Sequence, residues 1–265
     1  MSRYLVTATF YCLLTCITYA VYADTEMNLE VQTSSIQSDA ARGMDDEYEK
    51  LLRIIEKKRA PVQSLDGALN IKGRPGMGPK DSDVILVEFG DFQCAYCRRH
   101  LLGAAQQIHE KLVLTNQLRY VFLDFPLGER HPLAAKAAVA ARCAEEQEKY
   151  WEMRNTLYNN QKALHELFLV EHAKGTGMDE VAFSRCLHSG RYEAAIQQDQ
   201  VVGRSLGIKG TPTFFLGINN GDEIKLVRKI QGVQPYELFE REILYAVDIA
   251  KKQHESSSQI IQSGM

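Results

Sequence analysis

Residues 84–99, VILVEFGDFQCAYCRR, constrain the fold of this chain more than any other stretch. Residues 84–89 form a short apolar run rich in β-branched side chains, which predicts a buried strand. Gly90 and Asp91 end that run. Beyond it, apolar residues recur at helical spacing on one face: Leu101, Ala105, Ile108 and Leu112. The stretch therefore predicts a strand that passes into an amphipathic helix, with two cysteines at the junction.

The two cysteines, Cys94 and Cys97, form a CxxC pair. Cys94 would lie at the helix N-terminus, where free backbone N–H groups and the helix dipole favour a thiolate. Cys97 lies one turn further on, close enough to bond to Cys94 or to attack a mixed disulfide held there. The pair therefore predicts a redox device with an attacking and a resolving thiol. Zinc binding and purely structural cysteines are the alternatives, but no second CxxC or His pair completes a metal site, so we expect no metal.

The N-terminus has the pattern of a secretory signal peptide. One Arg precedes the uncharged, mostly apolar residues 4–23, and Val21 and Ala23 are small residues suited to cleavage after Ala23. An uncleaved membrane anchor is the alternative, because the run is just long enough to span a bilayer. Export would place the protein in the periplasm or another extracytoplasmic space, where thiol pairs are normally oxidised.

The remaining pattern predicts an α/β domain interrupted by helices. Residues 118–125 read as a second strand, which makes a right-handed βαβ unit with the first strand and its helix. From residue 132 to 206 every periodic segment is helical. The expected units are, in order, a signal peptide (1–23), a flexible segment with an amphipathic helix at 45–59 and a turn-rich linker (24–83), a first α/β part (84–129), a helical insertion (130–207), a second α/β part with a hairpin and a final helix (208–253), and a disordered tail (254–265).

Charge and cysteine content narrow the function further. A formal net charge of −3 offers no basic surplus for nucleic acid. Of the six cysteines, two fall in the expected signal peptide, so four remain, an even number that fits two disulfides in an oxidising compartment. With the CxxC pair bonded locally, Cys143 and Cys186 are left for each other on apolar helix faces. Two unpaired buried thiols are the alternative.

The chain resembles the DsbA-like thiol-disulfide oxidoreductases in four blocks that occur in the same order, FGDFQCAYCRR, HPLAAKAAVAARCAEEQEKYWEM, VAFSRCLHSGRY and GIKGTPTFFLG. The resemblance covers residues 84–251. It implies a thioredoxin-like fold with an inserted all-helical domain. The second and third blocks carry Cys143 and Cys186, which match a structural disulfide found in some members.

The resemblance also implies roles for single residues. Cys94 matches the solvent-facing attacking cysteine, and Cys97 matches its buried partner. Glu88 matches a buried acidic residue; a carboxyl in an apolar strand has a raised proton affinity and can take and return the proton of Cys97. A Glu at the strand end that reaches solvent is the alternative. Thr211 and Pro212 match a cis-proline loop that pairs with an extended substrate strand beside the sulfurs.

The dipeptide between the cysteines departs from the family pattern. Many members have Pro or Gly followed by His, Tyr or Ala, whereas this chain has Ala95 and Tyr96. No imidazole stands beside the thiolate, and Arg98 and Arg99 are the cations at hand. We therefore expect the helix end to supply most of the thiolate stabilisation, and Ala95 and Tyr96 to contact client peptides.

These features predict an exported enzyme that introduces disulfides into reduced or unfolded client proteins through Cys94 and Cys97, with no cofactor. The resemblance implies a membrane quinone-linked partner of the DsbB or VKOR type that reoxidises the pair. One alternative is a disulfide isomerase or reductase that forms a homodimer through the helix at 45–59. Another is a non-catalytic envelope protein that binds clients like a chaperone.

Overall fold

The computed structural model describes the backbone of residues 62–263 and the side chains of residues 62–255. The expected signal peptide and the helix at 45–59 lie outside the described residues. In the described part, no helix combines the length and the apolar character needed to cross a membrane.

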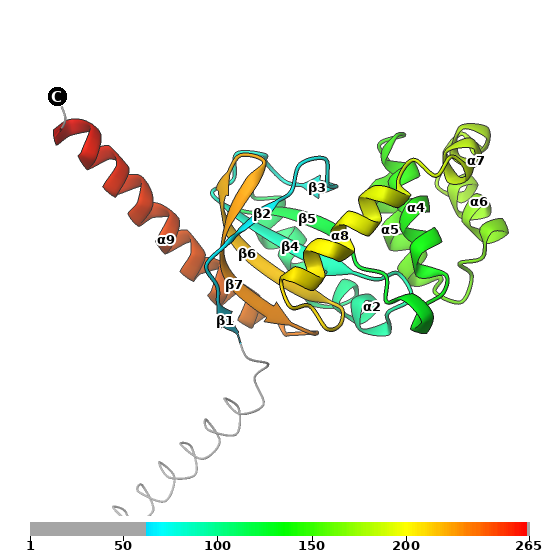
Figure 1. Cartoon of the computed structure of the whole chain (residues 1–265), viewed down its shortest axis with the longest axis horizontal. Helices are drawn as coiled ribbons and strands as arrows, with labels where there is room; N and C mark the ends of the chain where they lie inside the picture. Colours follow the sequence, from blue (N-terminus) through cyan, green and yellow to red (C-terminus); the bar gives the residue numbers. More distant parts are fainter. Residues whose placement is uncertain (1–61, 264–265) are drawn as a thin grey trace, which may run out of the picture. The chain divides into compact units, whose positions relative to one another are not determined.

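The described residues build one sheet, in which the order of strands is β1-β7-β6-β4-β5-β3 (Figure 1). Strand β4 (Val84–Gly90) is central, and every one of its residues is buried. It runs parallel to β5 (Arg119–Asp124) and antiparallel to β6 (Thr213–Asn220). Strand β7 (Glu223–Gln231) pairs with β6 as a hairpin. The strand predicted from residues 84–89 is therefore the one around which the sheet is assembled.

Three short strands precede β4, where the sequence predicted a linker. β1 (Gln63–Ser64) and β2 (Ala68–Asn70) pair with β7, and β3 (Gly76–Met77) pairs with β5. The prediction of a flexible segment and linker over 24–83 is therefore wrong for residues 62–77, which extend both edges of the sheet. Strands of two or three residues are too short for apolar alternation to reveal them.

The helix that follows β4 is broken rather than continuous. α2 (Ala95–Leu101) stops before Gly103, whose φ of −125° and ψ of −108° are not helical. α3 (Ala104–Ile108) then resumes the path, and η1 (His109–Val113) ends it as a turn of π-helix. Three of the four predicted face positions lie in these later pieces, and Ile108 and Leu112 are buried against the sheet.

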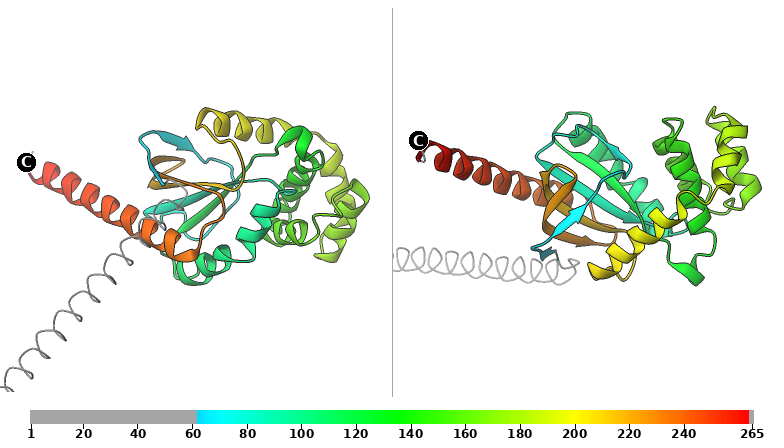
Figure 2. Two further views of the ribbon diagram at one scale, coloured as in Figure 1. Left: turned by 90° about the horizontal axis from the view of Figure 1, so that it is seen from below. Right: turned by 45° about the horizontal axis from the view of Figure 1, so that its top comes forward.

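The chain between β5 and β6 is helical. Figures 1 and 2 show the helices α4 to α7 gathered beyond one end of the sheet, while the last helix of this segment, α8, runs back over the sheet. A 3-10 turn, η2, precedes them, and the bounds are η2 (Gly128–Arg130), α4 (Ala134–Glu145), α5 (Tyr150–Asn159), α6 (Glu166–Gly175), α7 (Glu180–His188) and α8 (Glu193–Ser205).

A disulfide joins two of these helices. Cys143 of α4 and Cys186 of α7 are bonded, with 5.7 Å between their Cα atoms. Next to it, α7 begins with Asp179 as its N-cap, whose side chain accepts hydrogen bonds from the backbone N–H groups of Val181 and Ala182. The alternative of two free buried thiols is therefore wrong.

The final helix, α9 (Tyr236–Ser263), is longer than the sequence predicted. Its buried face carries Phe239, Ile243, Ala246 and Ala250, the positions expected from their spacing. The prediction of a disordered tail over 254–265 is wrong up to Ser263, because the backbone stays helical through a polar Ser/Gln-rich stretch. Without apolar periodicity, that stretch gave no sign of a helix.

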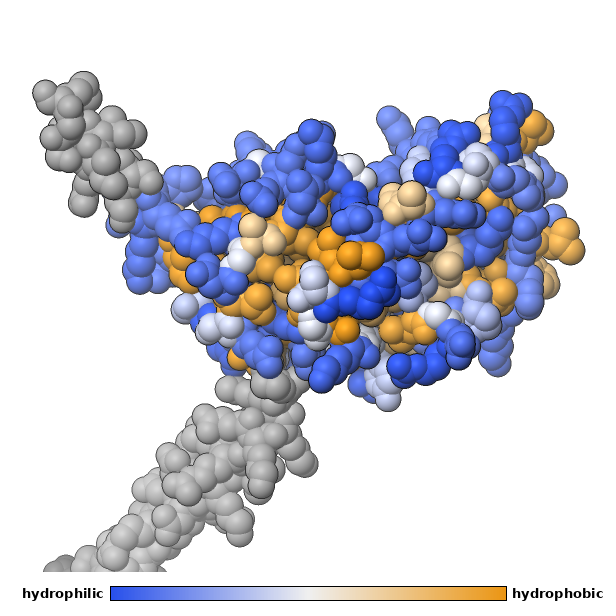
Figure 3. Space-filling view, viewed as in Figure 1, coloured by the Kyte–Doolittle hydropathy of each residue, from blue (hydrophilic) through white to orange (hydrophobic). Residues whose placement is uncertain are grey.

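Buried side chains form three clusters, which together locate the CxxC pair. One cluster packs α3, η1 and α9 on one face of the sheet. Another packs α8 and β2 on the opposite face, and Figure 3 shows apolar side chains gathered over the sheet between β2 and α8. The third fills the helical insertion and includes Phe92, Cys94 and Cys97. The CxxC pair is therefore packed against the core of the inserted helices.

Helix α8 approaches the sheet most closely at Gly203, where there is no room for a side chain. A Cβ atom at Gly203 would lie 2.5 Å from the ring of Phe125 and 3.2 Å from that of Phe89. We expect Gly203→Ala to lower the free energy of unfolding by about 2 kcal/mol, because overpacking outweighs the gain in helix propensity. Gly175→Ala, at the end of α6 with no atom within 4 Å, is the matched control and should be neutral or slightly stabilising. If urea denaturation gives the same change in the free energy of unfolding for Gly203→Ala and Gly175→Ala, the close packing at Gly203 is contradicted.

Candidate active site at the CxxC pair

Cys94 is the N-cap residue of α2, as predicted. Its sulfur lies 3.3 Å from the carbonyl oxygen of Thr211. The thiol of Cys97 donates a hydrogen bond to that sulfur, and this is the main cause that lowers the pKa of Cys94 from 9.0 to about 6, against the opposing effect of burial. The contact with Thr211 and the backbone N–H groups of Cys97 and Tyr96 lower it further. The expectation that the helix end supplies most of the thiolate stabilisation is therefore wrong. At neutral pH the Cys94 sulfur is therefore largely a thiolate.

Cys97 has the opposite environment. Its side chain is completely buried, and both cysteines are free thiols in the structure. Burial is the main cause that raises the pKa of Cys97 well above 9.0, followed by the hydrogen bond to Cys94 and the charge of Glu88. The reduced pair thus holds one anionic sulfur and one protonated sulfur, which is the asymmetry needed for thiol-disulfide exchange.

Cys94 is less accessible than a solvent-facing cysteine. Only 4% of its surface is exposed, so the expectation of an open sulfur is wrong for this reduced state. Two segments cover it. One is the loop at Thr211, and the other follows α5, where the side-chain amide of Gln161 donates hydrogen bonds of 2.9 Å to the carbonyl oxygens of Phe92 and Cys94.

The peptide bond between Thr211 and Pro212 is cis. Thr213, the next residue, starts β6 and pairs with Phe89 near the end of β4. Because Cys94 follows β4 by four residues, this pairing brings the cis-proline loop to the sulfur. The structure therefore unites Cys94, Cys97, Thr211 and Pro212 in one place, although they come from two distant blocks of sequence.

Glu88 is fully buried but not isolated. Its Oε2 accepts hydrogen bonds from Arg154, at 2.6 Å, and from the hydroxyl of Tyr120, at 2.5 Å. The prediction of a buried carboxyl is therefore confirmed, and the alternative of a Glu that reaches solvent is wrong. The other oxygen, Oε1, is buried without a hydrogen-bond partner in the described structure. The charge of Glu88 acts on Cys97, so the two groups share one buried region.

Sequence reasoning missed four residues of this region: Tyr120, Arg154, His100 and Gln161. Arg154 is on α5, and its partner Glu88 is 66 residues away in the chain. The one available signal was an Arg within the aromatic segment YWEMRNTLY. His100 lies 3.4 Å from the Tyr120 hydroxyl, and burial lowers its pKa to about 4, so its imidazole is neutral at pH 7.

The dipeptide between the cysteines faces outward. Ala95 is exposed, and Tyr96 exposes 59% of its surface. The guanidinium of Arg99 lies 5.3 Å from the centre of the Tyr96 ring. The contact with client peptides that we expected from Ala95 and Tyr96 stays a prediction, and the exposure of both residues is compatible with it. In the part of the chain that the structure describes, no group of three or more His, Cys, Asp or Glu residues is placed to hold a metal ion.

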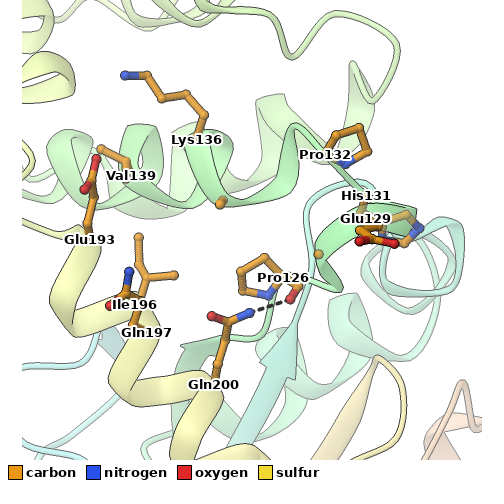
Figure 4. Close-up of a pocket in the computed structure, with 12 residues that line it drawn as sticks. Pro126, Glu129, His131, Pro132, Lys136, Val139, Glu193, Ile196, Gln197 and Gln200 are labelled. Atoms are coloured by element: carbon orange, nitrogen blue, oxygen red, sulfur yellow. Dashed lines mark hydrogen bonds between the residues drawn. The ribbon is translucent and has the colours of Figure 1, made fainter.

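A separate hollow of about 530 Å³ opens between α4 and α8 (Figure 4). Its wall includes Lys136 and Glu193, and Gln200 closes one side by donating a hydrogen bond to the carbonyl of Pro126. Neither cysteine lines it. His131 of this wall is bonded to Asp91 at 2.8 Å, three residues before Cys94, so the hollow borders the back of the CxxC loop.

A strand-helix-strand unit with a CxxC pair at the helix start, opposed by a cis-proline loop, defines a thioredoxin-fold protein with inserted helices. The thioredoxin family model matches residues 71–231, and the chain belongs to that family. Among solved structures it is similar to alpha-DsbA1 of Wolbachia pipientis (22% identity, 70% of this chain and 96% of that one, TM-score 0.60) and to BdbD of Bacillus subtilis (20% identity, 70% and 99%, TM-score 0.57). The fold is thus DsbA-like.

Two further similarities are to a solved oxidoreductase structure and to part of a curated transporter. A thioredoxin-like oxidoreductase from Silicibacter pomeroyi is 27% identical, with 68% of this chain and 94% of that one covered at a TM-score of 0.54. A curated Na(+)/H(+) antiporter, NhaA 3 of Salinispora tropica, is 36% identical over 139 residues, which is 52% of this chain. The match spans about a fifth of that relative's length, 21%.

The pKa of Cys94 can be measured from the ultraviolet absorbance of its thiolate in the reduced protein. We expect a midpoint near pH 6, below which the absorbance is lost as the sulfur binds a proton. Because the hydrogen bond from Cys97 is the largest cause, Cys97→Ala should move the midpoint up toward 9.0. A wild-type midpoint close to 9.0 would contradict the geometry described for Cys94.

The buried ion pair can be tested by a double-mutant cycle. We expect Arg154→Met to lower the free energy of unfolding by about 3–5 kcal/mol, because it leaves the Glu88 charge buried without its cation. Adding Glu88→Gln to that variant should recover part of the loss. Arg191→Met, which breaks an exposed pair with Glu146, is the control and should cost at most about 1 kcal/mol. If the loss of stability in the double variant equals the sum of the losses in Arg154→Met and Glu88→Gln alone, the two side chains do not interact.

Proposed function

We propose that this protein is an exported thiol-disulfide oxidoreductase that transfers its Cys94–Cys97 disulfide to client proteins. One observation carries the proposal: the Cys94 sulfur lies at the start of α2, against Cys97 and the cis-proline loop, with a pKa of about 6. A thiol with a low pKa is a good leaving group and is stable when reduced, so its disulfide is readily given up.

The exchange takes place in two steps. A client thiolate attacks the Cys94 sulfur, the bond between Cys94 and Cys97 breaks, and a mixed disulfide forms between client and Cys94. Cys97 leaves as a thiolate and takes up a proton, because its buried site favours the neutral thiol. A second client thiolate then attacks the client sulfur of the mixed disulfide and releases Cys94 as a thiolate. The client has lost two electrons, and the CxxC pair has gained them.

Glu88 is the group we assign to the proton of Cys97. Its Oε1 is buried without a hydrogen-bond partner in the described structure, and its charge acts on Cys97. In this proposal the carboxylate accepts the proton when the disulfide forms and returns it when Cys97 is released. Arg154 and Tyr120 fix the carboxylate through Oε2, so Oε1 is the oxygen left for this transfer.

Client binding is assigned to the cis-proline loop and the exposed dipeptide. An extended client segment can pair with the backbone near Thr211 while its cysteine meets the Cys94 sulfur. Ala95 and Tyr96 would contact the flanking client residues. The loops that cover Cys94 must then move aside for the client, because only 4% of that residue is exposed in the reduced structure.

Turnover needs an oxidant for the reduced pair. We propose a membrane partner of the DsbB or VKOR type, which would accept the two electrons and pass them to a quinone. Export to the periplasm, which the N-terminal sequence pattern supports, would bring the two proteins together. The isomerase or reductase alternative depends on a homodimer through residues 45–59, which lie outside the described part.

Two serine variants separate the roles of the cysteines. Cys94→Ser should abolish oxidation of a reduced client, because no disulfide can form and no sulfur is left to be attacked. Cys97→Ser leaves Cys94 without its resolving thiol, so it should accumulate a mixed disulfide with an activated client on a non-reducing gel. A Cys94→Ser protein that oxidises clients at the wild-type rate would refute the assignment.

The redox equilibrium of the wild-type CxxC pair can be measured in a glutathione buffer. We expect the pair to be mostly reduced, because the low pKa of Cys94 stabilises the reduced form.

A further inference from the structure

Exposed basic residues lie on three segments that contact Cys94. We define the basic rim as Arg98, Arg99, Lys162 and Lys209, all of which are exposed. Arg98 and Arg99 are on α2, Lys162 is in the loop after α5, and Lys209 is in the loop that leads to the cis-proline. The rim is therefore contributed by three segments that are distant in sequence.

Contacts with the backbone or the sulfur of Cys94 hold each of these segments next to that residue. The Arg98 backbone N–H donates to the carbonyl oxygen of Cys94, and Gln161, next to Lys162, donates to the same oxygen at 2.9 Å. Thr211, two residues after Lys209, places its carbonyl 3.3 Å from the Cys94 sulfur. Each segment of the rim thus touches Cys94 itself.

The positive charges of the rim are not neutralised locally. Among the described residues, no carboxylate lies within ion-pair distance of Arg98, Arg99, Lys162 or Lys209, although the chain as a whole carries a net charge of −3. The two acids nearest in sequence to Arg98 and Arg99 are Asp91 and Glu88, which are buried and paired with His131 and Arg154. Glu166, four residues after Lys162, is exposed and pairs with Lys136 and His188.

Lys229 of β7 is a further cation in this part of the molecule. Its side chain is buried, and its ammonium donates hydrogen bonds to the carbonyl oxygens of Leu206 and Gly207, just before Lys209, rather than to a carboxylate. Burial lowers its pKa, and the charge of Lys209 lowers it further. Since no carboxylate in the described residues is within ion-pair distance of either lysine, the loop before the cis-proline is electropositive.

A hollow of about 450 Å³ lies inside the rim. Arg98 and Lys162 line it, and the rest of its wall is Asn159, Asn160, Gln161 and Ala163. The two cations and the side-chain amides of Asn159 and Asn160 supply hydrogen-bond donors for a carboxylate, whereas both donors of the Gln161 amide are used on Phe92 and Cys94. The hollow is next to the Cys94 carbonyl, so its occupant would lie beside the reacting cysteine.

We propose that the basic rim is a client-recognition surface, and that it selects client segments with Asp or Glu next to the reactive cysteine. The client carboxylates would bind at Arg98 and Lys162 on one side of the sulfur and at Lys209 on the other. This inference rests on the proposed function, since the segment it binds is the one that exchanges disulfides with Cys94. Charges of one sign around a site raise the rate of encounter with ligands of opposite charge, and salt screens the effect.

Three reduced peptides test this preference. They share one sequence except for the residues on either side of a single cysteine, which are Glu, Gln or Lys. The rate at which each peptide reduces the oxidised wild-type protein is divided by its rate with a small neutral disulfide, which removes effects on the peptide thiol itself. At low salt we expect the Glu peptide to react about 10-fold faster than the Lys peptide, and the ratio to fall toward one in 1 M salt, where the Debye length is about 3 Å.

Charge-reversal variants locate the effect. Lys162→Glu combined with Lys209→Glu should lower the Glu-to-Lys ratio of rates below that of the wild type. Lys80→Glu combined with Lys225→Glu is the matched control, since it makes the same charge change at two exposed positions near the start of β4, at the end of the strand opposite to the CxxC pair. It should leave the ratio unchanged.

Two results overturn the inference in different ways. In the first, dithiothreitol reduces the oxidised wild-type protein, but all three peptides reduce it at the same corrected rate. The rim then does not recognise clients, and the proposed function stands. If the oxidised protein does not exchange with dithiothreitol either, the proposed function fails, and the inference fails with it.

Discussion

The ion pair between Glu88 and Arg154 is the interaction on which the site depends. Glu88 belongs to the central strand β4 and Arg154 to α5 of the insertion, and both side chains are buried. A buried ion pair seldom adds net stability compared with apolar packing, because both charges lose their hydration. Its effect is orientation: neither charge can be left alone, so α5 must lie where its guanidinium meets the strand. That constraint places the insertion against Cys97.

A second buried network ties the insertion to the sheet at another point. Arg142 of α4 donates to Asp124, at the end of β5, and to Asp199 of α8, and Arg74 reaches Asp199 from the segment before β3. Two arginines share two carboxylates, so the charges match in a region where Arg142 and both carboxylates are buried and Arg74 is partly exposed. Together the two networks make the helices between β5 and β6 part of the active-site scaffold.

The predictable part of this fold was local. The strand at 84–90, the helix start at Cys94 and the hairpin at Asn220 all have signals within a few residues, and the structure has each of them. The ion pairs were not predictable, because the sequence around an Arg in a helical segment does not indicate which acidic residue pairs with it, and the partner of Arg154 is 66 residues away. The burial of Cys94 was missed for the same reason, because it depends on loops that contain residues 161 and 211.

Two features of the site act on the same sulfur in different ways. The hydrogen bond from Cys97 and the start of α2 act within a few ångströms and set the charge of Cys94 in the reduced state. The cations of the rim are exposed and act through water, so their effect on the sulfur is screened, whereas their effect on an approaching chain extends over a Debye length of about 10 Å. Short-range contacts therefore determine the reactivity of Cys94, and exposed charges determine how often a client meets it. A change in the rim can alter which clients react without altering the reactivity of Cys94 and Cys97.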